Sequence, residues 1–499
     1  MKKGIIIVIA TALTLTVAAK NKAPKPLGFD ASKGTTQLLT MPSGTKVEYT
    51  AYEKLYFVTN IEDSTYQYLN IYVPKGATQQ TPIFLRTYVG GYMASQATGP
   101  QAGDASGRAL AEGYVLVIPG TRGRNSVVTK GKKTVYTGRA PKAILDLKAA
   151  IRYLRHFDKE IPGDAERIIT DGTSAGGAMS ALMGATGNNP AYNTYLKAMG
   201  AADERDDVFA SVCFCPITDL DHADMAYEWL YQHTDSRENH DAAHRQVTDE
   251  LAAQFPAYLQ SLQLTTDDGT LLTADNYLQF IKQEIIRAAQ IAKDAGAEIP
   301  DSLGFTFSEE AGGAPPVNGG ATGMTPRNDI PADVMRMMGN RKKRAGEYIT
   351  DLDMTKYLNY ITTQTALKTA PAFDSKGVAG NKASGENEEF GNEKGTSENF
   401  TAYSASKNGG TLVPEIQTLV QLMNPMPQIG RQDVTVAQHW YIRHGAIDRD
   451  TSFPVPLNLA MKLKNSGKDV NYLLAWNRPH SGDYSLDELF NWIRSITQN

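Results

Sequence analysis

The fold of this chain is decided by the stretch Asp171-Gly172-Thr173-Ser174-Ala175-Gly176-Gly177-Ala178. It contains the pattern Gly-x-Ser-x-Gly between an apolar run at residues 168–170 and a helix-like segment that starts near Gly177. At such a junction of strand, turn and helix, the two glycines permit a sharp turn that exposes the serine hydroxyl above the sheet. The pattern also occurs in ordinary glycine-rich turns, but its place in an α/β chain predicts that Ser174 is a nucleophile.

Segments typical of strands lie on both sides of this junction. Residues 55–59, 66–73, 83–89 and 114–118 are rich in β-branched and aromatic residues, and a further short run follows at 211–215. Between them, residues 141–157 have an apolar stripe at steps of three and four, which predicts a helix. Strands that alternate with helices indicate a mostly parallel sheet covered on both faces.

The alternation stops in the middle of the chain. Residues 226–262 and 274–295 look like long polar helices, whereas 304–324 and 377–410 read as loops rich in Gly, Asn, Ser and Glu. Strand-like segments return at 437–444 and 470–475, with helices expected at 454–463 and 485–496. We therefore predict one α/β domain in two parts, 40–219 and 411–499, with a mainly helical insertion at 220–410.

A nucleophilic serine needs a base and an acid. In folds with this junction both follow the serine in chain order and lie on loops after late strands. His480 comes just after the last expected strand, where the base belongs. Asp448 and Asp450 share the loop after the preceding strand, so either residue fits the acid. His439 and His444 come before that loop and fit core positions better than proton transfer.

Backbone amides near the serine are the expected donors to a developing oxyanion. One is the N–H of Ala175, which follows the nucleophile. The second is expected from Gly90 or Gly91, in the turn Val89-Gly90-Gly91-Tyr92 after the third strand-like run. We call this the 89–92 turn.

Two other sets of residues have patterns that also occur in functional sites. Arg122 and Arg124 follow the strand at 114–118, and an active-site position fits them as well as a structural one. His240 and His244 are four residues apart in a helical segment, a spacing found in metal sites. The segment is polar and lacks a nearby cysteine, so we predict no metal.

Composition and charge narrow the possible partners. The 499 residues include 50 Lys and Arg against 54 Asp and Glu. The chain has no long basic block that could bind along a phosphate backbone, so no nucleic-acid partner is expected. The two cysteines, Cys213 and Cys215, are too close in sequence for an easy bridge, so we expect buried thiols.

The first residues have the pattern of a secretory signal. Lys2 and Lys3 precede an apolar run at residues 5–17, and Ala18 and Ala19 follow it. This pattern predicts a signal peptide at 1–19 and a secreted or cell-envelope protein, with a retained N-terminal anchor as the alternative. No later apolar run reaches membrane-spanning length.

Four segments together resemble a known family. They are Gly-Thr-Ser-Ala-Gly-Gly at 172–177, Tyr-Val-Gly-Gly-Tyr-Met at 88–93, His-Trp-Tyr-Ile-Arg-His-Gly-Ala-Ile-Asp-Arg-Asp at 439–450 and Arg-Pro-His-Ser-Gly-Asp-Tyr at 478–484. These segments resemble those of the bacterial tannases, which are serine esterases with an α/β-hydrolase fold and a large lid, and which hydrolyse galloyl esters of tannins. The resemblance extends from about Tyr49 to the C-terminus.

The resemblance implies the chemistry as well as the fold. It implies Ser174 as nucleophile, Asp448 as acid and His480 as base, in an acyl-enzyme mechanism that releases gallate without a cofactor. Two alternatives share the fold and the order of the triad: a feruloyl-type esterase acting on hydroxycinnamate esters, and a secreted serine peptidase of prolyl-oligopeptidase type. A phenolic-binding protein on an inactive scaffold is disfavoured, because all three triad residue types are present in order.

The resemblance also implies residues that bind the galloyl ring. Asp450, Lys368 and Glu386 would contact its three hydroxyls, and Glu388 is the alternative to Glu386 because the preceding stretch is longer here. Two carboxylates and an ammonium suit a ring with adjacent hydroxyls. A site built to bind hydroxyls rejects analogues that lack them, by up to about 10⁴- to 10⁵-fold.

Overall fold

The computed structural model describes residues 26–308 and 348–498. The predicted signal peptide at 1–19 and most of the predicted loop at 304–324 lie outside the described residues. Within the described ranges, no helix combines the length and the apolar character needed to cross a membrane.

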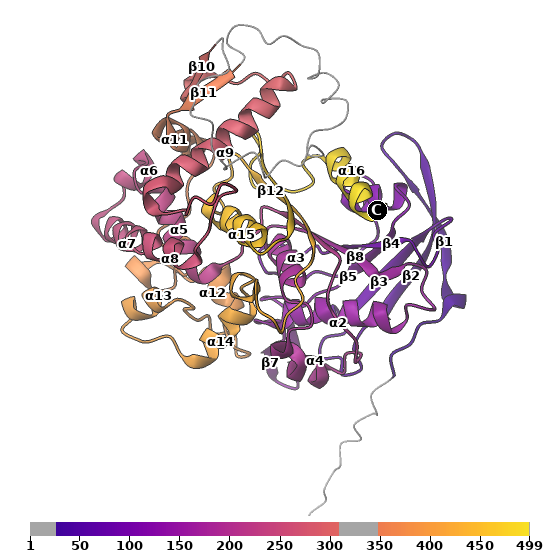
Figure 1. Cartoon of the computed structure of the whole chain (residues 1–499). Coiled ribbons are helices and arrows are strands. Elements are labelled where there is room, and N and C mark those ends of the chain that lie inside the picture. The colour runs from indigo at the N-terminus through magenta and orange to yellow at the C-terminus, as the bar shows by residue number, and fades with distance from the viewer. Residues whose placement is uncertain (1–25, 309–347, 499) are drawn as a thin grey trace, which may run out of the picture.

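One large sheet organises the chain (Figure 1). Its strands, in spatial order, are β1 (Thr35–Thr40), β2 (Lys46–Tyr56), β3 (Tyr68–Pro74), β5 (Val115–Pro119), β4 (Pro82–Arg86), β8 (Asp164–Thr173), β9 (Ala210–Phe214), β12 (His439–Gly445) and β13 (Asp469–Ala475). The strands from β5 to β13 pair in parallel, whereas the pairs β1–β2, β2–β3 and β3–β5 are antiparallel. The prediction of a mostly parallel sheet is therefore confirmed. The sheet begins earlier than residue 40, because β1 adds an edge strand.

Helices cover both faces of this sheet. They are α1 (Ala105–Ala111), α2 (Lys142–His156), α3 (Ala175–Ala185), α4 (Asn193–Met199), α15 (Pro454–Asn465) and α16 (Leu486–Thr497). Strand β5 shows the two layers, because Val115 and Val117 pack in the core shared with α2 and α3. Leu116 and Ile118 point the other way, into the core shared with α1 and α16. A strand buried on both faces needs such an unbroken apolar run.

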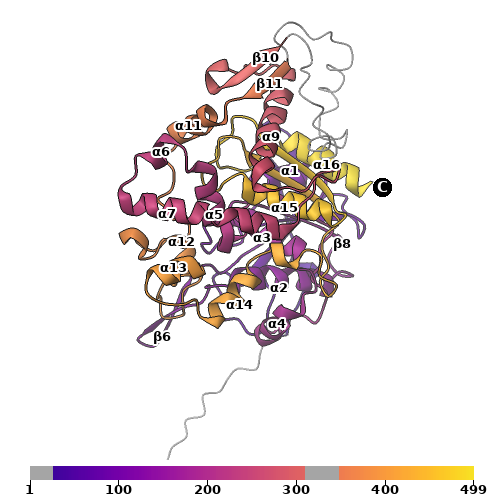
Figure 2. The same ribbon diagram turned by 60° about the vertical axis from the view of Figure 1, so that its left-hand side comes forward.

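The predicted insertion lies in a single crossover, residues 215–438, between the neighbouring strands β9 and β12. Within the described residues, its helices of four residues or more are α5 (Leu220–Tyr231), α6 (Asp235–Glu238), α7 (Ala242–Ala252), α8 (Phe255–Leu262), α9 (Ala274–Asp294), α11 (Met354–Gln364), α12 (Gly385–Glu389), α13 (Ala402–Lys407) and α14 (Pro414–Leu422). Figures 1 and 2 show these helices gathered on one side of the molecule, beside the sheet. Helix α14 belongs to this crossover by connectivity, although the sequence division placed it in the part 411–499.

Some local predictions within the crossover are wrong. The single helix expected at 226–262 is four helices, α5 to α8, because the chain starts new helices inside it. The Asp241 carboxylate accepts hydrogen bonds from the first amides of α7, and Pro256 lies in the first turn of α8, where its missing N–H costs nothing. The expected loop at 377–410 contains α12 and α13. The strands β10 (Phe305–Ser308) and β11 (Tyr348–Leu352) pair as a separate two-stranded antiparallel sheet.

Candidate active site

Ser174 lies on a strained turn between β8 and α3. Its backbone has φ 63° and ψ −124°, a conformation that a non-glycine residue adopts only where the surroundings enforce it. Its N–H donates to the Phe214 carbonyl at 2.9 Å. A side chain on Gly172 would overlap the Gly176 carbonyl, and one on Gly176 would lie 2.8 Å from the Val89 carbonyl. Both glycines are therefore needed for the close backbone approach.

The structure brings Ser174, His480 and Asp448 together in one hydrogen-bonded chain. His480 Nε2 lies 2.8 Å from Ser174 Oγ, and His480 Nδ1 lies 2.7 Å from Asp448 Oδ2. Asp448 is fully buried, whereas Ser174 and His480 are half-buried. This arrangement lets the imidazole take the hydroxyl proton while the carboxylate holds the other ring nitrogen.

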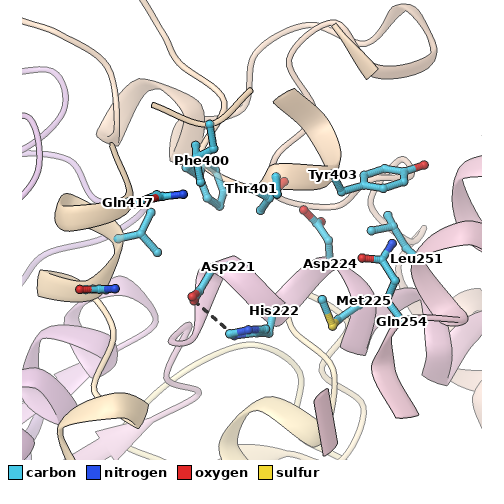
Figure 3. A pocket seen from close by; sticks show the side chains of 14 residues that line it. Asp221, His222, Asp224, Met225, Leu251, Gln254, Phe400, Thr401, Tyr403 and Gln417 are labelled. Carbon is cyan, nitrogen blue, oxygen red and sulfur yellow. Dashed lines mark ion pairs between the residues drawn. The ribbon is translucent and has the colours of Figure 1, made fainter. Parts of the chain in front are cut away.

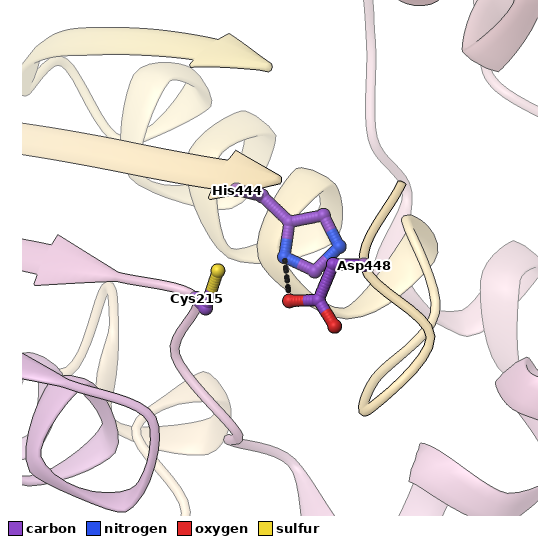
Figure 4. Close-up of side chains that lie close together, drawn as sticks. All are labelled: Cys215, His444 and Asp448. Atoms are coloured by element: carbon purple, nitrogen blue, oxygen red, sulfur yellow. Dashed lines mark ion pairs between the residues drawn. The ribbon is translucent and has the colours of Figure 1, made fainter. Parts of the chain in front are cut away.

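The buried Asp448 carboxylate lies close to two residues from neighbouring strand ends, Cys215 and His444 (Figure 4). The His444 Nδ1 atom lies 3.5 Å from Asp448 Oδ2, and burial lowers the pKa of His444 to about 4, so this ring is neutral at ordinary pH. Burial alone would raise the pKa of Asp448, but His444 and His480 bring it below its ordinary value. Cys213 and Cys215 are free and buried, as expected.

The loop that carries His480 is held from within by Tyr484. The Tyr484 hydroxyl donates to the Pro479 carbonyl at 2.8 Å and accepts from the Ser481 N–H at 3.1 Å, so it fixes the backbone on both sides of the histidine. The same oxygen lies 2.8 Å from Cys215 Sγ. Sequence reasoning missed this role, although Tyr484 closes the segment 478–484 that carries the base.

Glycines also bring this loop against the acid loop and the nucleophile turn. A side chain on Gly445 would overlap the Arg478 carbonyl, and one on Gly482 would overlap Thr173, the residue before the nucleophile. The Ile447 N–H donates to the Arg478 carbonyl at 3.1 Å. The acid, base and nucleophile loops are thus packed backbone against backbone.

The predicted oxyanion donors lie around the nucleophile turn. Ala175 is the first residue of α3, and its amide faces outward from the helix N-terminus. The 89–92 turn lies against Gly176, as the approach of the Val89 carbonyl shows. Among the described residues, none accepts a hydrogen bond from the amides of Ala175, Gly90 or Gly91. These donors are available to a bound oxygen.

Two of the predicted ring-binding residues lie beside the triad. The Asp450 carboxylate is within 4.8 Å of ligand atoms of Asp448 and His480. The Tyr227 hydroxyl links the loop of Asp450 to the segment of Lys368, because it donates to the Arg449 carbonyl at 2.8 Å and accepts from the Lys368 N–H at 3.1 Å. The Lys368 ammonium lies 4.0 Å from the ring centroid of Phe373.

The two candidate glutamates of α12 have different surroundings. Glu388 forms an ion pair with Arg124, so its carboxylate is already engaged. Glu386 is half-buried, and no described residue pairs with its carboxylate. Glu386 follows Gly385, which lies against the Arg124 guanidinium, and Arg124 Nε donates to the Gly91 carbonyl, so Glu386 lies near the 89–92 turn. The geometry favours Glu386 over Glu388 as a ligand of the substrate.

The arginine and histidine candidates outside the triad have other partners. Arg122 is fully buried and pairs with Asp146, which assigns it to the interior. The His244 ring nitrogens lie 2.7 Å from an Asp241 oxygen and 3.1 Å from Asn381 Oδ1, and His240 Nε2 lies 3.4 Å from an Arg237 nitrogen.

A separate pocket of about 460 Å³ opens on another face of α5 (Figure 3). Asp221 and His222 lie on its floor, facing Phe400 and Tyr403. With Asp219 they form a group with the donor types of a metal site, but Asn424 already donates to both carboxylates at 2.7 Å. None of the predicted site residues lines this pocket.

A serine activated by a histidine and a buried carboxylate, on a strand-turn-helix junction of a mostly parallel sheet, defines a serine hydrolase of the α/β-hydrolase class. A family model described as BD-FAE matches residues 69–258. Among curated proteins, none is similar enough in sequence to count as a match.

Solved structures give a closer assignment. The tannase of Fusobacterium nucleatum is 35% identical with a TM-score of 0.79, and the match covers 95% of this chain and 99% of that chain. The tannin acyl hydrolase of Lactobacillus plantarum is also 35% identical with a TM-score of 0.79, covering 94% and 98%. A tannin acyl hydrolase in complex with ethyl gallate gives the same four values. The chain belongs to the tannase family.

The Tyr484 hydroxyl provides a test of how the base is held. Tyr484→Phe removes both hydrogen bonds that flank His480, so we expect kcat to fall about 10- to 100-fold, because small misplacements of a catalytic group are costly. Steady-state kinetics on an ester substrate measure this effect, with the thermal unfolding midpoint as a control for folding. An unchanged kcat in a folded variant would show that the loop positions His480 without the Tyr484 hydroxyl.

Removing the charge of Asp450 and removing the charge of Lys368 should shift the pKa of His480 in opposite directions. Burial alone would lower the pKa of His480, but Asp448 and Asp450 raise it above its ordinary value of 6.5, while Lys368 acts against them. The base must be neutral to accept the serine proton, so activity rises with pH through this pKa. Asp450→Asn should move the acid limb of kcat/KM to lower pH, and Lys368→Met should move it to higher pH. Shifts in the same direction would contradict this account.

Proposed function

We propose that this protein is a serine esterase that hydrolyses galloyl esters, including the ester and depside bonds of tannins, and releases gallate. The observation that carries the proposal is the Ser174–His480–Asp448 hydrogen-bonded chain with Asp450 and Lys368 beside it. A related tannin acyl hydrolase in complex with ethyl gallate, and one in complex with 3,4-dihydroxybenzoate, support the choice of substrate.

The proposed reaction has two symmetrical halves. His480 takes the Ser174 proton, and Oγ adds to the ester carbonyl to form a tetrahedral oxyanion. The Ala175 amide and the 89–92 turn donate to that oxyanion. The alcohol leaves with the proton from His480, which gives the acyl-enzyme. Water then adds in the same way, with His480 as base again, and releases the acid; no step needs a cofactor.

Recognition of the ring is proposed to rest on Asp450, Lys368 and Glu386. Two carboxylates can accept from the ring hydroxyls and the ammonium can donate to them, so that a ring with adjacent hydroxyls satisfies all three. An ester without these hydroxyls leaves the polar groups unpaired, which costs binding in the transition state. We propose that the crossover acts as the substrate-selecting part of the enzyme, because it supplies Lys368 and Glu386.

A substrate panel tests the reaction class. We expect hydrolysis of methyl gallate, weaker hydrolysis of methyl ferulate and none of a proline-containing chromogenic peptide. Ser174→Ala should lower kcat by at least about 10⁴-fold, because the acyl-enzyme cannot form. Hydrolysis of the peptide alone would overturn the esterase assignment, and full activity of Ser174→Ala would overturn the mechanism.

The role of Glu386 is tested by a ratio of substrates. Glu386→Gln should lower kcat/KM on methyl gallate about 10-fold or more, since a charged acceptor for a ring hydroxyl is lost. The rate on p-nitrophenyl acetate, which has no ring hydroxyl, serves as the internal reference. Glu393→Gln is the matched control, because Glu393 is exposed and uses only its backbone carbonyl, toward Tyr136. Equal losses on both esters would remove Glu386 from ring recognition.

We also propose that the protein is exported after cleavage near Ala19. The basic pair Lys2 and Lys3, the apolar run at 5–17 and the small residues after it support this proposal. Expression in a secretion-competent bacterium should give an extracytoplasmic protein whose N-terminus, determined by mass spectrometry, lies near Lys20. An intact N-terminus in a membrane-bound protein would support the retained anchor instead.

A further inference from the structure

The 89–92 turn has two successive residues in the left-handed region. Gly91 has φ 54° and Tyr92 has φ 57°, so the peptide planes here are set by their hydrogen bonds rather than by regular structure. The Gly90 carbonyl accepts from the Met93 N–H at 3.0 Å. In a trans peptide the N–H points away from the C=O, so this bond also sets the direction of the Gly91 N–H.

The next peptide plane is held by a side chain. Arg124 Nε donates to the Gly91 carbonyl at 2.7 Å, and the Arg124 N–H donates to the Tyr92 carbonyl at 2.8 Å. A hydrogen bond from a guanidinium is stronger than one between neutral groups. Arg124 therefore holds the far side of the turn whose near side presents the predicted oxyanion donors.

The other end of the same guanidinium holds helix α12. Arg124 Nη1 forms an ion pair with Glu388, two residues after Glu386. The helix lies directly on the guanidinium, because a side chain on Gly385 would approach its Nε, Cζ and Nη2 atoms to 3.1, 3.2 and 3.3 Å. The side chains of Arg124 and Glu388 are 20% and 40% exposed, so solvent screens this ion pair in part, and the backbone hydrogen bonds of Arg124 contribute to the arrangement as well as the pair.

We propose that Arg124 is a positioning residue that holds the 89–92 turn and helix α12 in one fixed arrangement. Through it, the seating of the substrate ring against Glu386 is linked to the alignment of the amides that stabilise the oxyanion. This inference rests on the proposed esterase function and adds a residue to it. Arg124 itself touches no reacting atom in this account.

The consequence is a loss of turnover rather than of binding alone. Loss of one oxyanion donor lowers kcat about 10²- to 10³-fold. A donor that is displaced but still present should cost less than this. A purely structural arginine would change the unfolding temperature and leave the kinetics of the folded enzyme intact. A residue that only binds the ring would change KM for galloyl esters and spare other esters.

The experiment compares four variants on two esters. Methyl gallate uses both the ring site and the oxyanion donors, whereas p-nitrophenyl acetate uses only the latter. Arg124→Gln should lower kcat at least about 10-fold on both esters. Glu388→Gln, which releases only the α12 end, should lower kcat on p-nitrophenyl acetate by a smaller factor than on methyl gallate. Arg124→Lys keeps the charge and should recover part of the activity on both esters.

Arg431→Gln is the matched control, because Arg431 pairs with Asp433 on the surface and should leave both activities unchanged. Circular dichroism confirms that each variant is folded, and Arg124→Lys carries the test if Arg124→Gln is not. Wild-type kcat in a folded Arg124→Gln, or a change confined to KM for methyl gallate, would overturn the inference. Failure of the proposed function is distinct: the wild type would then cleave p-nitrophenyl acetate but not methyl gallate, and the effect of Arg124 on the former would still be measured.

Discussion

A single buried guanidinium connects three of the segments that build the active site: the nucleophile strand, the base loop and the strand that leads into the 89–92 turn. Arg86, at the end of β4, pairs with Asp171, three residues before the nucleophile, and donates two hydrogen bonds of 3.0 Å to Asp483, three residues after the base. The same strand leads into the 89–92 turn. Burial raises the pKa of Asp171 to about 7, even against the opposing charge of Arg86. Burying these charges is costly, and their mutual pairing is what makes the arrangement tolerable.

Local patterns made part of this site predictable. The nucleophile was predictable because a sharp turn demands glycines at fixed offsets from Ser174, and the base because His480 follows the last strand. Position along the chain did not separate the acid from its neighbour, since Asp448 and Asp450 share one loop, and only the resemblance to the bacterial tannases assigned Asp448. Burial distinguishes them: the first lies under His480, and the second is half-buried beside it.

The contacts that hold the site could not be predicted, because they join residues far apart in the chain. Arg124 and Glu388 are separated by 264 positions, and Arg86 and Asp483 by 397. The helix breaks of the crossover have a different cause. Residues 226–262 keep a helical composition throughout, and within them the capping by Asp241 and the position of Pro256 mark where α7 and α8 begin.

The placement of the crossover also bears on when the enzyme becomes competent during its synthesis. Ser174 and His480 are 306 positions apart, and the whole crossover separates β9 from β12, the strand before the acid. A nascent chain that ends within the crossover holds the nucleophile but neither partner, so it is hydrolytically silent. The triad can assemble only after β12 has paired with β9 and β13 has paired with β12, so activity appears late in folding.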